Sequence, residues 1–252
     1  LEVSRAKKDV INEQDFGFLI APRLNASGRL STAHHGVELL LSNSYRVPCH
    51  LAVIPALLEQ SLVERLAGIP DIWITQHGYN HQPYAAEGER KRELGGPRPR
   101  IEIVEQLDAG AEILHKAFPM RYLNVLVPPW NRYDTDLQPA INERYDWLSV
   151  LGPRPETEKA QPPQLNVHVD IINWKTRTFA GDDVPLQQLI SHLEQRRSGV
   201  VDSSEPTGVM THHLAHDPYC WAFMEKLFKT LNEHPNVRWL GGRELFPSRR
   251  AD

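Results

Sequence analysis

Two hydrophobic periodicities alternate along most of the chain. Short apolar runs rich in β-branched residues indicate buried strands over 46–55, 122–127, 147–151, 165–172, 208–213 and 237–240. Between them, leucines recur at helical spacing opposite charged residues, which indicates helices over 56–67, 101–117, 137–143, 184–197 and 219–233. This alternation predicts an α/β fold with parallel strands, either a barrel or a doubly wound sheet.

Polar side chains gather where the predicted strands end. A further apolar run, Ile72-Trp73-Ile74, predicts another strand, and His77 and His81 follow it. The groups are His77 with His81, the Trp-Asn-Arg run at 130–132, Asp170, and His212 with His213. In a (β/α) barrel the carboxyl ends of all strands surround one active-site face, so these groups favour the barrel over the open sheet. The charged, Gly- and Pro-rich stretch 82–100 is expected to be an exposed excursion at that rim.

The spacing of His77 and His81 permits metal binding. Imidazole nitrogens are good ligands for zinc and related divalent ions, and a four-residue offset lets both rings converge within one turn. Two hydrogen-bonded loop histidines would give the same pattern, so the spacing alone leaves both interpretations open.

Charge and composition exclude several classes of protein. The chain of 252 residues has 28 Lys+Arg and 32 Asp+Glu, so no global basic field favours nucleic acid. Cys49 and Cys220 are too few for a disulfide framework, which favours a reducing, cytoplasmic compartment. No apolar run is long enough to span a membrane, and the first residues lack the apolar core of a signal peptide, so no membrane partner is expected.

The amino-terminal stretch differs in character from the rest. An apolar run at 16–21 is typical of either a strand or a buried helical turn, 22–30 predicts a small-residue loop and 32–41 a helix. Arg23 and Arg29 flank the loop, where they would either hold a phosphate or carboxylate or be ordinary solvated charges.

Residues 12–41, above all Pro-Arg-Leu-Asn-Ala-Ser-Gly-Arg-Leu at 22–30, resemble a segment of RecJ-type single-strand exonucleases. In those enzymes the segment joins the phosphoesterase domain to a domain that contacts nucleic acid. The Asp and His motifs that bind their metals are absent here, so the resemblance implies no exonuclease activity. It leaves a nucleic-acid-binding module as one alternative function, although nucleic acid is an unlikely partner for this acidic chain.

Residues 45–247 resemble the polysaccharide deacetylases of the NodB-homology group, carbohydrate esterase family 4. The similarity lies in four motifs: Gln76-His77-Gly78-Tyr79-Asn80-His81, Val127-Pro128-Pro129-Trp130-Asn131-Arg132, Val167-His168-Val169-Asp170 with Trp174, and Gly208-Val209-Met210-Thr211-His212-His213. The resemblance implies a distorted or incomplete (β/α) barrel. It also implies hydrolysis of an N-acetyl or related amide with a divalent metal, most simply zinc.

The resemblance also implies roles for single residues. His77 and His81 would be metal ligands. Residues 129–132, with Asn131 among them, would form a groove wall in which the backbone N–H near Trp130 stabilises the oxyanion, and Trp174 would support the pocket. Arg132 and Asp170 would orient neighbouring groups, although the family's arginine precedes the prolines and Arg132 follows them. His212, with His213 as its alternative, would protonate the leaving amine.

One family motif is missing. A pair of aspartates, one a metal ligand and one the general base, is expected upstream of residue 45, yet the acidic residues there are Glu2, Asp9, Glu13, Asp15 and Glu38. The chain therefore has the pattern of a hybrid: a RecJ-like segment at 1–44, able to supply the first strand and helix, and a deacetylase-like barrel at 45–252. We expect an impaired deacetylase, or alternatively a catalytically dead chimera or carbohydrate-binding homologue. The identity of the substrate, an acetylated sugar or a small amide, stays open, and so does the oligomeric state.

Overall fold

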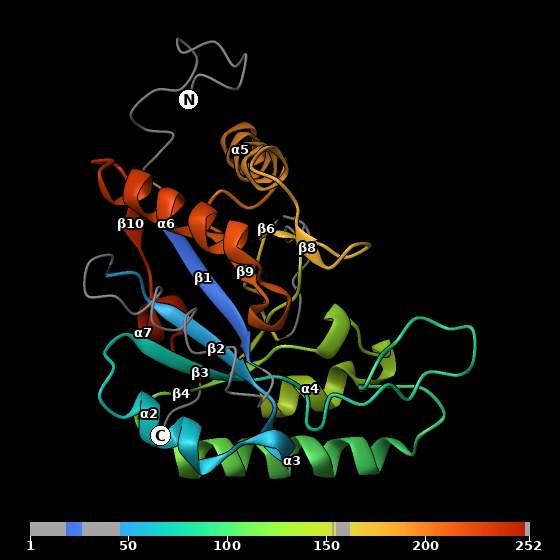
Figure 1. The fold of residues 1–252 in the computed structure, drawn as a ribbon. Helices are drawn as coiled ribbons and strands as arrows, with labels where there is room; N and C mark the ends of the chain where they lie inside the picture. The colour runs from blue at the N-terminus through green and yellow to red at the C-terminus, as the bar shows by residue number, and fades with distance from the viewer. Residues whose placement is uncertain (1–18, 27–45, 153, 155–161, 250–252) are drawn as a thin grey trace.

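A parallel β-sheet forms the centre of the molecule (Figure 1). The computed structural model describes residues 19–26, 46–152, 154 and 162–249, and for 19–26 it describes the backbone alone. The sheet strands are β1 (Leu19–Ala26), β2 (Cys49–Val53), β3 (Ile72–Gln76), β4 (Tyr122–Leu126), β5 (Trp147–Leu148), β6 (Val169–Asp170), β9 (Thr207–Thr211) and β10 (Arg238–Trp239). A separate antiparallel hairpin joins β7 (Ile172–Asn173) to β8 (Thr178–Phe179).

The strand order is β5-β4-β3-β2-β1-β9-β6, with β10 paired to β1. All these pairs are parallel. The two end strands do not pair with each other in the described residues. Isolated bridges join Leu148 to Gln164 and Leu151 to Val167 instead, just before β6. The predicted fold class is therefore confirmed: the sheet is a distorted, incomplete (β/α) barrel.

Helices cover the sheet on both sides (Figure 1). The α-helices are α2 (Gln60–Leu66), α3 (Arg100–Ala117), α4 (Gln138–Arg144), α5 (Asp183–Ser198), α6 (Pro218–Asn232) and α7 (Gly242–Leu245). Short 3-10 turns are η2 (Pro55–Leu57), η3 (Pro129–Asn131), η4 (Thr135–Leu137) and η5 (His213–Ala215). Helix α3 contacts β3 and β4, whereas α5 contacts β6 and β9.

Apolar faces of these helices build the core. Helix α6 buries Phe223, Met224, Leu227 and Phe228 in the same cluster as Leu51 of β2. Such burial is the main favourable term in folding, at about 25 cal/mol per Å² of apolar surface. The leucine spacing that predicted each helix is thus the spacing that the core requires.

The order of strands and helices agrees with the sequence prediction from residue 46 onward, with one correction there and a second in β1. The strand predicted over 165–172 breaks into the bridge at Val167, then β6, then β7, because Asp170 turns its backbone toward the hairpin through a hydrogen bond from the Ile172 N–H. The loop predicted from residue 22 is wrong over 22–26, where β1 continues. Proline has a fixed φ compatible with extended backbone, so Pro22 removes a donor without ending the strand. The helix predicted over 32–41 lies outside the described residues.

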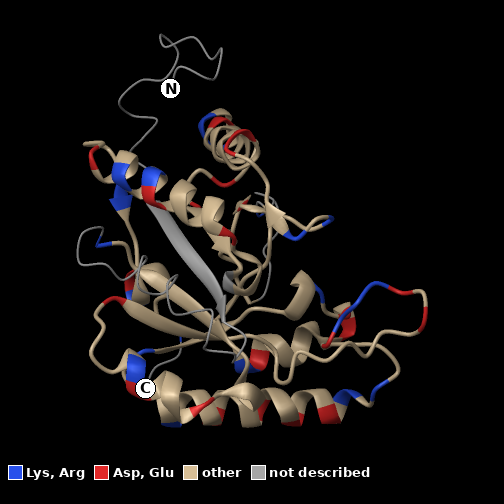
Figure 2. Ribbon diagram, in the orientation of Figure 1, with Lys and Arg blue, Asp and Glu red and all other residues tan. Residues whose placement is uncertain are grey.

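The excursion between β3 and α3 is largely exposed over 82–91, as predicted, but it is buried at 93–95, where the sequence predicts exposure. Glu93 and Leu94 are at most 1% exposed, and Leu94 forms a bridge with Tyr133. Asp134 pairs with Arg92 and Arg100, each at 2.9 Å. Acidic and basic residues interleave along this segment, whereas the charged residues of α3 between Arg100 and Lys116 are all acidic (Figure 2). The charges that predicted exposure thus partly neutralise one another.

The sequence also predicts a reducing, cytoplasmic compartment and no membrane partner. Both cysteines are buried free thiols, and burial raises the pKa of Cys220 to about 11. Within the described ranges, no helix combines the length and apolar character needed to cross a bilayer. The cytoplasmic location stays a prediction.

Candidate functional site

His77 follows β3 directly and is oriented by the next strand. Its Nδ1 lies 2.8 Å from the backbone oxygen of Val127, and because a carbonyl can only accept, Nδ1 carries the proton. The lone pair of the neutral ring is therefore on Nε2, the arrangement that metal-ligating histidines use. Burial, with the nearby His81 and His212, lowers the pKa of His77 to about 3, against the opposing bond to Val127.

His81 meets His77 across a tight turn. The two ring centroids are 5.1 Å apart, and the His81 ring also lies 4.4 Å from that of Trp130. The backbone of His81 has φ of 55°, in the left-handed region that non-glycine residues adopt rarely. Burial lowers the pKa of His81, which keeps its imidazole neutral and able to bind a cation.

A buried carboxylate that the sequence analysis missed supports this turn. Glu93 accepts from the backbone N–H groups of Tyr79 at 2.6 Å, Asn80 at 3.1 Å and His81 at 2.8 Å. Burial raises the pKa of Glu93, and these three donors oppose the shift. Gly78, at φ 56°, approaches so closely that a Cβ there would lie 2.5 Å from Oε2 of Glu93. In the sequence Glu93 is one charge among many in 82–100, so no local signal marks it.

The segment after β4 forms the next part of the site. Trp130 and Asn131 both have φ of 56°, strained values for residues with side chains. The N–H of Asn131 bonds to the Pro128 oxygen at 3.0 Å, so it is used within the turn. Arg132 donates from Nη1 to the Lys91 oxygen at 3.3 Å, and no contact with Asp170 is recorded among the described residues.

Asp170, Trp174 and His212 form a third group. Trp174 Nε1–H donates to Oδ2 of Asp170 at 2.7 Å, and its ring meets that of His212 edge-on, with centroids 4.5 Å apart. Burial raises the pKa of Asp170, opposed by the bonds from Trp174 and the Ile172 N–H. The N–H of His212 donates to Nε2 of His216 at 3.2 Å, which fixes the start of η5.

The structure thus brings the predicted groups to one end of the barrel. The charge of His212 affects the pKa of His77, which places strand ends β3 and β9 within electrostatic reach of each other. The two imidazoles fit two positions of a divalent-metal site. Among the described residues, no third histidine, cysteine or carboxylate forms a group with them in which all ligand atoms lie within 4.8 Å of one another. Catalytic zinc sites usually have three protein ligands.

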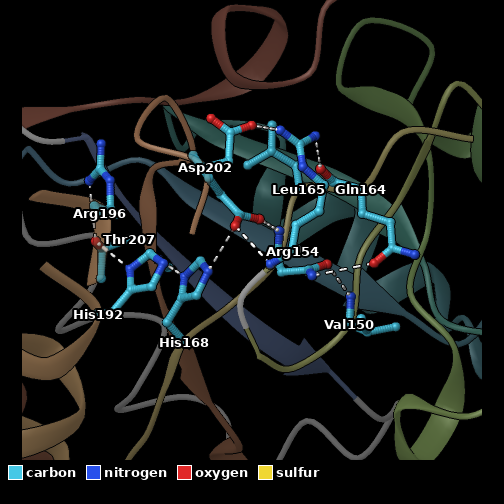
Figure 3. A network of polar contacts seen from close by, with 12 residues as sticks. Val150, Arg154, Gln164, Leu165, His168, His192, Arg196, Asp202 and Thr207 are labelled. Atoms are coloured by element: carbon cyan, nitrogen blue, oxygen red, sulfur yellow. Dashed lines mark hydrogen bonds and ion pairs between the residues drawn. The ribbon is translucent and has the colours of Figure 1, made fainter. Parts of the chain in front are cut away.

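A second histidine group joins the residue before β6 to helix α5 and to the segment before β9 (Figure 3). His168, His192 and Glu205 are all buried and have ligand atoms within 4.8 Å of one another. His168 Nδ1 accepts from the Gly208 N–H at 3.0 Å, so its proton is on Nε2, which faces Glu205 Oε2 at 3.4 Å. Sequence analysis placed His168 on its strand but gave no signal for the other two.

This second group does not fit a metal ion. Because Nε2 of His168 carries the proton, it offers no lone pair to a cation. The rings of His168 and His192 are stacked 3.5 Å apart at 16°, so their in-plane lone pairs lie in nearly parallel planes and cannot converge on one ion. Burial raises the pKa of Glu205, but the bond from His168 and the N–H groups of Arg154 and Asn166 outweigh it and hold that pKa low. The group is a structural polar network.

Comparison with solved structures gives the fold. A peptidoglycan N-acetylglucosamine deacetylase is 14% identical, with a TM-score of 0.60 over 93% of this chain and 90% of that one. A family 4 acetyl xylan esterase from Clostridium thermocellum, in complex with cobalt, is 14% identical, with a TM-score of 0.57 over 90% of each chain. A CE4 family pseudoenzyme from Bacillus anthracis is 13% identical, with a TM-score of 0.56 over 88% of this chain and 63% of that one. The fold is that of family 4 polysaccharide deacetylases.

Comparison by sequence gives a short match. The single-stranded-DNA-specific exonuclease RecJ of Haemophilus influenzae is 41% identical over 68 residues, 27% of this chain. Those residues span 12% of the exonuclease. No protein-family model matches the chain.

Proposed function

We propose that this protein is a metal-dependent hydrolase of N-acetyl-type amide bonds whose metal site is incomplete. The observation that carries the proposal is the paired imidazoles of His77 and His81, with the Nδ1–H of His77 fixed on the Val127 oxygen. Asp170, Trp174 and His212 lie at neighbouring strand ends, where a barrel places its chemistry.

His77 and His81 would hold the ion through ring nitrogens. A divalent ion, zinc in our proposal, would polarise the acyl oxygen and lower the pKa of a water molecule at the site. The Trp130 N–H would donate to the oxyanion, with Asn131 and Arg132 in the groove wall.

Proton transfer would come from His212. Water would add to the acyl carbon and lose one proton to solvent, because the carboxylate base is lacking. The carbon–nitrogen bond would then break as a protonated His212 delivers its proton to the nitrogen. The products would be an amine and a carboxylic acid, which ionises to the carboxylate. Trp174 would hold Asp170 and contact His212 from the side.

The site is incomplete because no carboxylate occurs at the end of β1. That strand lies between β2 and β9, at the centre of the site, and it ends in Asn25 and Ala26. No acidic residue occurs in the sequence from 16 to 37. The expected ligand and general base are therefore lacking there. We propose that residues 1–44 are a RecJ-like segment that supplies the first strand of a barrel completed by 45–252.

A catalytically dead or carbohydrate-binding homologue is the second candidate. The absent carboxylates favour it, and one neighbour of the same fold is itself named a pseudoenzyme. A nucleic-acid module is the third, with the 68-residue match to RecJ in its favour. The net charge of −4 opposes it.

Acetate release separates the first two candidates. The protein is incubated with chitooligosaccharides in zinc or cobalt, and we expect slow release that His77→Ala abolishes. Release that persists in His77→Ala would contradict the proposal. Oligosaccharide binding without release with either ion would favour the second candidate. A salt-dependent mobility shift with single-stranded DNA would favour the third.

A further inference from the structure

We propose that Glu93 is a positioning residue for the two-histidine site. Its carboxylate holds the turn 78–81 in the conformation that brings His81 against His77. The inference rests on the proposed metal-binding function of these histidines. It assigns a role to an acidic residue from the excursion, outside all four sequence motifs of the site.

The geometry is that of an anion held by successive backbone donors. Glu93 Oε1 accepts from the N–H groups of Tyr79 and Asn80, and Oε2 accepts from that of His81. The side chain is wholly buried, with 0% exposure of the residue. Hydrogen bonds to a charged acceptor are about twice as strong as neutral ones, so one side chain organises three consecutive residues.

The turn needs such an acceptor. His81 has φ of 55° and Gly78 has φ of 56°, and the left-handed region is unfavourable for a residue with a side chain. Three part-buried N–H groups would otherwise lose their acceptor within the protein, which is unfavourable. Glu93 satisfies all of them in this conformation, which is also the conformation that packs the His81 ring against Trp130.

Charge gives the carboxylate a second effect on the same site. The carboxylate of Glu93 in its ionised form, hydrogen-bonded to the backbone of the turn, would attract a cation bound by the neutral imidazoles. The end of β1 supplies no carboxylate, so a residue beneath the turn provides nearby negative charge without being a ligand. Residues that orient metal ligands in this way typically change metal affinity by about 10–100-fold when replaced.

The test uses Glu93→Gln, which keeps size and removes charge. The matched control is Glu89→Gln, because Glu89 is an exposed acid of the same excursion and pairs with Arg92 at 2.7 Å. Two measurements are made on the full chain: cobalt affinity by calorimetry, and amide hydrogen exchange of residues 79–81 in metal-free protein. We expect Glu93→Gln to weaken cobalt binding about tenfold or more and to accelerate exchange at all three amides. Glu89→Gln should change neither.

The outcomes separate this inference from the proposed function. Wild-type exchange rates at residues 79–81 in Glu93→Gln would overturn the positioning role, whatever cobalt does. Unchanged cobalt affinity in Glu93→Gln, with binding abolished in His77→Ala, would also overturn it and leave the metal site intact. If wild-type protein binds no cobalt, the proposed function fails and the exchange rates alone decide the role of Glu93. Should Glu93→Gln fail to fold, Glu93→Asp, which retains the charge but is shorter, undergoes the same two measurements.

Discussion

The indole N–H of Trp174 donates a 2.7 Å hydrogen bond to the carboxylate of Asp170, although the tryptophan is 52% exposed. The same ring contacts the edge of His212. An aromatic residue on the hairpin after β6 therefore connects an acid on β6 to a histidine after β9. Trp174 thus links two of the strand ends on which the proposed chemistry depends.

Trp174→Phe should raise the pKa of Asp170. Phenylalanine keeps an aromatic contact with His212 but cannot donate to the carboxylate, and that hydrogen bond is one of the two that lower the Asp170 pKa. The pKa is measured by carboxyl NMR titration. Trp147→Phe is the control, since its indole donates to the Pro247 oxygen at 2.8 Å, away from Asp170. An unchanged Asp170 pKa in Trp174→Phe would contradict the assigned contact.

Gly78→Ala should destabilise the protein by about 2 kcal/mol or more. The new Cβ would lie 2.5 Å from Glu93 Oε2 and 2.7 Å from Pro129 Cγ, at a φ unfavourable for alanine. Chemical denaturation measures the loss. Gly68→Ala is the matched control: a Cβ there meets nothing within 4 Å, so its effect should stay within about 0.5 kcal/mol. Equal stabilities of the two variants would mean that the turn is not tightly packed.

Stability should fall as the pH drops below about 6.5, and His192 should contribute to this. Burial, with nearby His168, lowers the pKa of His192 to about 3, against the opposing charge of Glu205. Between about 3 and the ordinary value near 6.5, the unfolded chain binds a proton that the folded one does not, so lower pH favours unfolding. The slope is at most about 1.4 kcal/mol per pH unit.

His192→Asn tests this contribution. Its amide can replace the bond between Nδ1 and Thr207 Oγ1, which is 2.9 Å long, without a titratable ring. Urea unfolding at pH 7.5 and pH 5 should show a smaller acid-induced loss of stability in the variant, by roughly 1–2 kcal/mol. An identical loss in both proteins would show that His192 does not titrate with folding.

A carboxylate at the end of β1 should strengthen metal binding. Successive side chains of a strand point to opposite faces, so of Asn25→Asp and Ala26→Asp one places its carboxylate toward the site and the other away. Leu24 pairs with Thr211 of β9, which puts this strand end beside His212. Zinc titration by calorimetry should therefore show an increase in affinity of about tenfold or more for one variant and none for the other. No change in either would contradict the placement of β1 at the centre of the site.

Sequence patterning predicted most of the fold. The helix predicted over 101–117 and the strand predicted over 122–127 match α3 and β4 within one residue. The helix buries one apolar face and the strand is an apolar run, so both leave a clear pattern in the sequence. The strand at 165–172 was mispredicted, since a short apolar run does not reveal where Asp170 bends the chain. Continuation of β1 through Pro22 was missed for a similar reason: pairing with β2 and β9 outweighs the local preference for a turn.

The sequence by itself determined that strands and helices alternate and that polar residues, His77 and Asp170 among them, fall at strand ends. These properties depend on periodicity along the chain. Tertiary structure alone decided that Glu93 supports the turn of His81, that His212 lies within electrostatic reach of His77, and that His192 belongs to a structural network. Each of these depends on contacts between residues distant in sequence, or on the burial of a polar group. Burial of a polar group is tolerated only when hydrogen-bond partners surround it, and the sequence does not reveal those partners.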